Sequence, residues 1–188
     1  MVILRLFLRK VVTVCLALFI SAHTGYAQHH HLPYAGGERR SIKALSPELV
    51  QDYLNGKGMG LSLAAELNHY PGPAHVLELA SELNLHEGQK LKIQVIFDKM
   101  HRQAVDIGKA IVDQERKLDE QFKKRAIDSD SLRRIVRDSS LLHGELRIAH
   151  MQAHIEAAQV LTQEQIQQYD KLRGYYTGME HPSQSHIR

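Results

Sequence analysis

The fold is decided by residues 89–125, which read QKLKIQVIFDKMHRQAVDIGKAIVDQERKLDEQFKKR. Apolar side chains recur in this stretch at spacings of three, four and seven residues: Ile93, Phe97, Met100, Ala104, Ile107, Ile111 and Leu118, with Phe122 near the end. Such spacing places them on one side of an α-helix, whose period is 3.6 residues. The stretch is therefore predicted to form one long helix with a single apolar face, ending at about Arg125.

The following segment repeats the pattern on a second helix. Its inward positions are Leu132, Ile135, Ser139, Leu142, Leu146, Ala149 and Ala153. Between the two helices stands Asp128-Ser129-Asp130, a break that also caps the next helix. Because the break is short, the helices must fold back antiparallel. No β-strand alternation is present, so the predicted fold class is all-α: a long antiparallel helical hairpin with short flanking helices.

A third helix is predicted after the segment Leu161-Thr162-Gln163-Glu164-Gln165. Thr162 can cap the free amides of the next turn, while the side chain of Gln165 reaches back to the amide of Thr162, which makes a capping box. Gly174 is expected to end this helix. The segment Leu85-His86-Glu87-Gly88-Gln89 has the same shape at the start of the long helix, with His86 in place of the capping Thr.

The region before the hairpin predicts short helices. Ser46-Pro47-Glu48 is a strong helix start, with Ser as N-cap and Pro at the first helical position. Gly56, Gly58 and Gly60 then form a loop around Met59. The glycines and the nearby lysine do not make a phosphate-binding loop, because the required spacing and a preceding strand are both absent.

The N-terminus predicts a secretory signal peptide, and therefore export from the cytoplasm. Arg5, Arg9 and Lys10 precede an apolar stretch from Val11 to Ala22, and small residues follow, with cleavage expected near Ala27. The alternative is an uncleaved N-terminal anchor. The predicted organisation is a signal peptide (1–27), a flexible His-rich leader (28–40), a short-helix region (41–72), a helical domain (73–176) and a disordered tail (177–188).

Removing residues 1–27 changes the bulk properties of the chain. It removes three of the 24 basic residues and none of the 21 acidic ones, so the formal charge becomes zero with His neutral. A nucleic-acid partner is therefore not expected. The only cysteine, Cys15, is also lost, which excludes a disulfide or thiolate metal site. No nucleophile motif and no ATP-binding motif is present, so the protein is predicted not to be an enzyme.

The histidines predict a metal site on the hairpin. His150 and His154 are four residues apart and share a helix face, which is a workable half-site for a divalent ion. The antiparallel register brings His101 opposite them, with Asp98 one turn away from it. Three nitrogens and one oxygen would suit zinc, copper or nickel. The alternatives are a solvated helix face, or contacts in helix packing or a dimer.

Two further sets of residues are candidates for binding. Cleavage after Ala27 would expose Gln28-His29-His30, which can wrap Cu(II) or Ni(II) in a square plane of nitrogens; the alternative is an incidental polar leader. The hairpin tip carries a basic set that could attract acidic unfolded chains, or simply be solvated. This basic set is Lys123, Lys124, Arg125, Arg133, Arg134 and Arg137.

One motif of the chain consists of Leu161, Thr162 and Gln165. It follows the helical run Leu146-Arg147-Ile148-Ala149-His150-Met151-Gln152-Ala153-His154, in a chain that starts with an export signal. This combination resembles the LTxxQ-motif proteins. These are the Spy/CpxP family of periplasmic chaperones and their heavy-metal-sensing relatives of the CnrX and ZraP type. The resemblance implies a cradle-shaped homodimer of helical hairpins, with His150 and His154 as metal ligands in the metal-sensing case.

The resemblance leads to one main functional prediction. This is an ATP-independent chaperone of the envelope stress response that shields unfolded periplasmic or outer-membrane proteins and needs no cofactor. The alternative is a heavy-metal sensor or metal-binding resistance protein that uses the helix histidines and signals to a membrane-bound sensor. A structural helical module with neither activity is the third interpretation.

Overall fold

The computed structural model describes Tyr34 and residues 36–175. Contacts divide the chain into two units, 1–35 and 36–188, and all described residues except Tyr34 belong to the second. The predicted signal peptide, the leader residues Gln28, His29 and His30, and the predicted tail from 177 onward lie outside the described residues.

The described chain is helical and contains no β-strand between residues 36 and 175, which confirms the predicted all-α class. None of its helices is long and apolar enough to cross a membrane. The elements in order are the 3-10 helix η1 (Gly37–Arg39), α2 (Pro47–Leu54), α3 (Leu63–Glu66), α4 (Pro73–Glu78), α5 (Glu87–Lys123), α6 (Ser129–Val160) and α7 (Gln163–Arg173).

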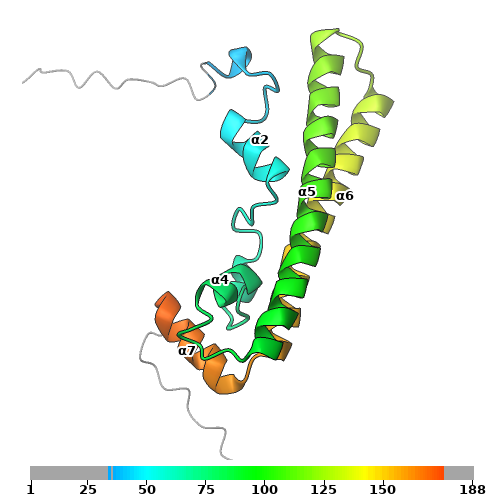
Figure 1. The fold of residues 1–188 in the computed structure, drawn as a ribbon. Helices are drawn as coiled ribbons and strands as arrows, with labels where there is room; N and C mark the ends of the chain where they lie inside the picture. The colour runs from blue at the N-terminus through cyan, green and yellow to red at the C-terminus, as the bar shows by residue number, and fades with distance from the viewer. Residues whose placement is uncertain (1–33, 35, 176–188) are drawn as a thin grey trace, which may run out of the picture. The chain divides into compact units, whose positions relative to one another are not determined.

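Helices α5 and α6 form the predicted antiparallel hairpin, which dominates the ribbon in Figure 1. The 37 residues of α5 make it about 55 Å long at about 1.5 Å per residue. It ends at Lys123, two residues before the expected Arg125. Asp128 caps α6, because its carboxylate accepts a hydrogen bond from the backbone amide of Ser131 at 2.7 Å.

The short helices cover the apolar face of the hairpin in two clusters. One joins α2 and the chain before it to the middle of α5 and α6, through Ile42, Leu45 and Tyr53 among others. The other lies where α5 begins and α6 ends, and gathers Val76 from α4 and Tyr169 from α7. Figure 1 shows α2 and α4 alongside α5, and α7 at the end of the hairpin away from its turn.

Helix α2 approaches α5 closely because of a glycine. A Cβ added to Gly108 would collide with the backbone carbonyl of Tyr53. Tyr53 itself is buried, and its ring meets the edge of the His143 ring at 5.8 Å between centroids. Gly108 was not singled out from the sequence, where an isolated glycine in a helix usually only weakens it.

Candidate functional site

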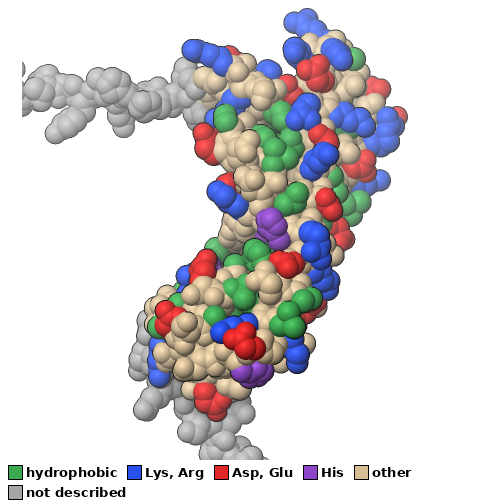
Figure 2. Space-filling model, viewed as in Figure 1, with side chains coloured by type: hydrophobic (Ala, Val, Ile, Leu, Met, Phe, Trp, Pro, Cys, Tyr) green, Lys and Arg blue, Asp and Glu red, His purple; other side chains and the backbone are tan. Residues whose placement is uncertain are grey.

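A cavity of about 700 Å³ opens between the short helices and the hairpin. One wall is the glycine loop 55–60 and the chain from α3 to α4, and the other is the middle of α5 and α6. The polar and sulfur-containing side chains that line it are Asn55, Lys57, Met59, Ser62, Glu66, His75, Glu78, Met100, His101, His150, His154, Arg173 and Tyr175. In Figure 2, a histidine is visible in the hollow where the molecule narrows.

His150 and His154 both line this cavity and are both buried, with 4% and 7% of their surface exposed. Nδ1 of His154 donates to the carbonyl of Tyr70 at 2.7 Å, which leaves Nε2 of a neutral ring free. Nε2 of His150 is buried without a hydrogen-bond partner among the described residues. Burial lowers the pKa of His150, and His154 and His101 lower it further. The neutral, ligand-competent imidazole is therefore favoured.

His101 also reaches the cavity, as the antiparallel register predicts, but Asp98 is not among its lining residues. Nε2 of His101 donates to the carbonyl of Asn55 at 3.1 Å, and the ring stacks on Phe97 at 5.6 Å between centroids. The carboxylate of Asp98 instead accepts a hydrogen bond from Gln94 at 2.8 Å. Of the four expected ligands, the structure brings three histidines to one cavity and leaves the aspartate outside it.

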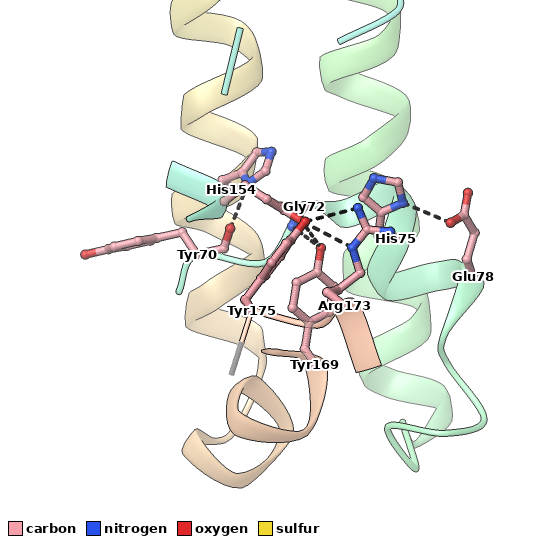
Figure 3. A network of polar contacts seen from close by, with 9 residues as sticks. Tyr70, Gly72, His75, Glu78, His154, Tyr169, Arg173 and Tyr175 are labelled. Atoms are coloured by element: carbon pink, nitrogen blue, oxygen red, sulfur yellow. Dashed lines mark hydrogen bonds and ion pairs between the residues drawn. The ribbon is translucent and has the colours of Figure 1, made fainter. Parts of the chain in front are cut away.

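The buried carboxylate of the cavity is Glu66 from α3, which is 6% exposed. Its Oε1 accepts hydrogen bonds from Tyr169 at 2.6 Å and Tyr175 at 3.0 Å, and lies 3.5 Å from Nε of Arg173. Burial and the Glu66 hydrogen bond raise the pKa of Tyr169, so its hydroxyl remains a donor. Figure 3 shows Tyr169, Arg173 and Tyr175 gathered with His154 around Gly72.

The second carboxylate oxygen of Glu66, Oε2, remains available to a ligand. Oε2 accepts no hydrogen bond and lies 3.5 Å from Nδ1 of His154. A Cβ on Gly72 would stand 3.1 Å from Nε2 of His154 and 3.3 Å from this oxygen, so only glycine leaves the space open. Glu66 was missed from the sequence, because a short turn between loops carries no periodic signal that marks one carboxylate as inward.

The described side chains that could ligate a metal share one cavity but do not form a complete set of metal ligands. Within the described part of the chain, no three His, Cys, Asp or Glu side chains stand close enough to hold a metal ion. Two buried polar atoms, Nε2 of His150 and Oε2 of Glu66, nevertheless lack hydrogen-bond partners there. Atoms of this kind are costly to bury without a partner, which a water molecule or a cation can supply. These donors are of the types that bind divalent transition metals.

The hairpin end carries all six predicted basic residues on its surface, from Lys123 to Arg137. Lys123 and Lys124 share one carboxylate, that of Glu120. Figure 2 shows Lys and Arg side chains gathered at this end. Large apolar side chains are exposed among them, namely Phe122 (53%), Leu132 (37%) and Val136 (45%). The tip is thus both cationic and apolar, which the basic residues alone did not indicate.

A second exposed apolar feature runs along α6. Leu141, Ile148 and Ile155 are exposed and seven residues apart, so they form one stripe on the helix. The buried positions of α6, such as Leu146 and Ala153, fall on the opposite face. This stripe has no partner within the described part of the chain.

The motif residues Leu161, Thr162 and Gln165 form the predicted capping box. Thr162 Oγ1 accepts from the amide of Gln165 at 3.2 Å, and Gln165 Oε1 accepts from the amide of Thr162 at 2.9 Å. The motif's Leu161 is buried in the cluster at the α7 end. His86 makes the equivalent box at the start of α5, with Nδ1 accepting from the amide of Gln89 at 3.1 Å.

The part of the chain that carries this motif is also the part that matches a known protein family. No curated protein and no solved structure matches the chain. The sequence model described as "LTXXQ motif family protein" matches residues 74–173, which is more than half of the chain and spans α4 to α7. The chain therefore belongs to the LTXXQ motif family, which includes Spy/CpxP-like periplasmic proteins.

Proposed function

We propose that this protein is a periplasmic, ATP-independent chaperone of the envelope stress response, which shields unfolded periplasmic or outer-membrane proteins. The observation that carries this proposal is the hairpin tip, where six exposed cations surround exposed Phe122, Leu132 and Val136. Long-range attraction brings acidic unfolded chains to the tip, and the apolar side chains hold them there. Neither step needs nucleotide.

Export is part of this proposal. It is supported by the sequence of residues 1–27, in which Arg5, Arg9 and Lys10 precede an apolar stretch that ends in Gly25-Tyr26-Ala27. Fractionation followed by mass spectrometry tests it. We expect a periplasmic species that begins at or near Gln28, whereas a membrane-bound species that retains residues 1–27 would contradict it.

Aggregation of a denatured acidic protein, measured by light scattering without ATP, tests the chaperone activity. The wild-type protein should suppress scattering at equimolar ratio, and less so at high salt, because salt screens exposed charges. A variant with the six tip cations changed to Gln should lose most of the suppression. The matched control also changes six exposed cations to Gln, all away from the tip: Lys92, Lys99, Arg102, Lys109, Arg147 and Lys171. No suppression by the wild type at any ratio would refute the chaperone function.

We also propose that the working form is a homodimer. The support is the stripe formed by Leu141, Ile148 and Ile155, whose seven-residue spacing fits packing against a helix of a second copy. Analytical ultracentrifugation tests this assignment. Changing all three residues to Ser should yield monomers, while a dimer that persists would place the contact elsewhere.

A second candidate function is metal binding, as a heavy-metal sensor or resistance protein. Its specific support is the cavity, where His101, His150 and His154 lie with Glu66. Two of these residues, His150 and Glu66, have buried atoms without hydrogen-bond partners among the described residues, so these atoms are available to a ligand. Asp98, the ligand expected from spacing, is replaced in this proposal by Glu66. The cation would be zinc, nickel or copper.

Thermal unfolding with and without zinc or nickel tests the metal proposal. The parent should carry His29→Gln, His30→Gln and His31→Gln, so that the leader cannot bind the ion. Metal at one hundred times Kd should stabilise the fold by about 2.7 kcal/mol. His150→Gln and His154→Gln should abolish this gain, while His143→Gln, whose ring packs on Tyr53, should not. Equal stabilisation of parent and double variant would refute the site.

A further inference from the structure

Two methionines line the same cavity as the buried histidines. Met59 comes from the glycine loop and Met100 from α5, where it is 8% exposed. Met59 also packs against the core cluster that contains Met100. The cavity thus combines two thioether sulfurs with the imidazole of His150, whose Nε2 is buried without a hydrogen-bond partner among the described residues.

The backbone at Met59 is unusual for a residue with a side chain. Its φ is +45°, in the left-handed region, between Gly58 and Gly60. Glycine adopts this conformation without the steric penalty that methionine incurs. Strain of this kind persists where the surrounding structure enforces it, and it concentrates at functional sites. This conformation fixes the direction in which the Met59 side chain leaves the loop, on the wall of the cavity that it lines.

The chemistry of the donors selects the ligand. Thioethers are soft, neutral donors that prefer soft cations, whereas zinc and nickel are served by imidazole and carboxylate. Among the carboxylates of the cavity, the buried Glu66 accepts hydrogen bonds from Tyr169 and Tyr175 through Oε1 and has only Oε2 without a hydrogen-bond partner among the described residues. Met59 and Met100 line the same cavity as His150, whose Nε2 has no hydrogen-bond partner among the described residues. A Cβ added to Gly58, next to Met59, would stand 4.0 Å from Nδ1 of His150, so the glycine loop lies close to this ring.

We propose that Met59, Met100 and His150 form a site for a soft monovalent cation, Cu(I) or Ag(I), on the wall of the cavity. This inference rests on the proposed metal-binding function and specifies its metal class. The thioethers supply selectivity, because they ligate soft ions and add little for zinc. His150 supplies the nitrogen and anchors the site to α6, so binding joins the glycine loop to both helices of the hairpin.

Isothermal titration with Ag(I) and, separately, with Zn(II) tests the site. The parent, which is the reference protein for all variants, is the full chain carrying Cys15→Ser, His29→Gln, His30→Gln and His31→Gln, so that neither the thiol nor the leader histidines bind the ions. Met59→Leu and Met100→Leu should each weaken Ag(I) binding at least about tenfold and leave Zn(II) binding unchanged. Met151→Leu is the matched control, because Met151 lies on α6 and does not line the cavity. Leu replaces Met at similar volume, at a cost below about 1.5 kcal/mol.

The possible outcomes distinguish failure of the soft-cation site from failure of the proposed metal-binding function. If Ag(I) binds the parent and both Leu variants equally, the thioethers are packing groups and the soft site is refuted, while the metal-binding function stands. Zn(II) binding that is tighter than Ag(I) binding refutes the assigned metal class alone. If neither Ag(I) nor Zn(II) binds, both the soft site and the metal-binding function are refuted. Should Met100→Leu fail to fold by circular dichroism, Met59→Leu decides, because Met59 lies in a loop and is only partly buried.

Discussion

Gln89 and Gln165 bond each other through both side-chain amides. Nε2 of Gln89 donates to Oε1 of Gln165 at 2.8 Å, and Nε2 of Gln165 donates to Oε1 of Gln89 at 3.1 Å. Each glutamine also closes the capping box of its own helix. The final residue of the family motif therefore ties the start of α7 to the start of α5. A glutamate would retain the cap but lack the N–H groups for the link.

The amide pair predicts that Gln165→Glu destabilises the fold by about 1–3 kcal/mol, because it removes donors to Gln89 and to the carbonyl of Leu83. Urea denaturation measures the loss. Gln163→Glu is the control, since it adds the same charge to the first turn of α7 at an exposed position. Equal stability of the two variants would show that the pair contributes nothing.

The close approach of α2 to α5 predicts opposite effects for two glycines. Gly108→Ala should cost about 1–3 kcal/mol, because its Cβ would meet the carbonyl of Tyr53. Gly144→Ala meets nothing within 4 Å and should stabilise the fold by up to about 1 kcal/mol. Thermal unfolding of both variants compares them. A stabilised Gly108→Ala variant would contradict the contact between α2 and α5.

Burial of His150 predicts a loss of stability in acid. Its pKa is lowered from an ordinary value of 6.5, first by burial and then by His154 and His101. The unfolded chain therefore takes up a proton at this site before the folded chain does. The free energy of unfolding should fall as pH drops below about 6.5 towards the lowered pKa of the folded state.

Urea denaturation at pH 7.5, 6.5 and 5.5 in metal-free buffer measures this dependence. His150→Gln should flatten the profile, because it removes the group whose pKa changes on folding. His143→Gln, on the same helix but outside the cavity, serves as the control and should leave the slope unchanged. If His150→Gln keeps the wild-type slope, the acid sensitivity arises elsewhere.

The hairpin was predictable because its information is local. The apolar period from Ile93 to Leu118, the break at Asp128 and the cap at Thr162 each act within a few residues, and all three appear as expected. Gly174 likewise ends α7, with φ of +74°. The placement of His101 on the same cavity as His150 and His154 followed from the hairpin register alone.

Other features were not predictable, because they depend on distant segments or on the orientation of single side chains. Glu66 reaches Tyr169 over 103 positions in sequence, and no periodic pattern relates the two residues. His86 is not a residue type expected to cap a helix, yet its Nδ1 accepts the same hydrogen bond as a threonine hydroxyl. Asp98 was expected on the metal site because it is one turn from His101, but its helix position turns it towards Gln94 instead.

Site-specific photo-crosslinking to an unfolded acidic protein tests the chaperone account most directly. A photoreactive residue at position 136, exposed at the tip, is compared with one at position 159, exposed near the far end of the same helix. The account predicts that the client crosslinks several times more strongly at 136, and that changing the six tip cations to Gln removes the difference. Equal crosslinking at both positions, or stronger crosslinking at 159, would contradict client binding at the hairpin tip.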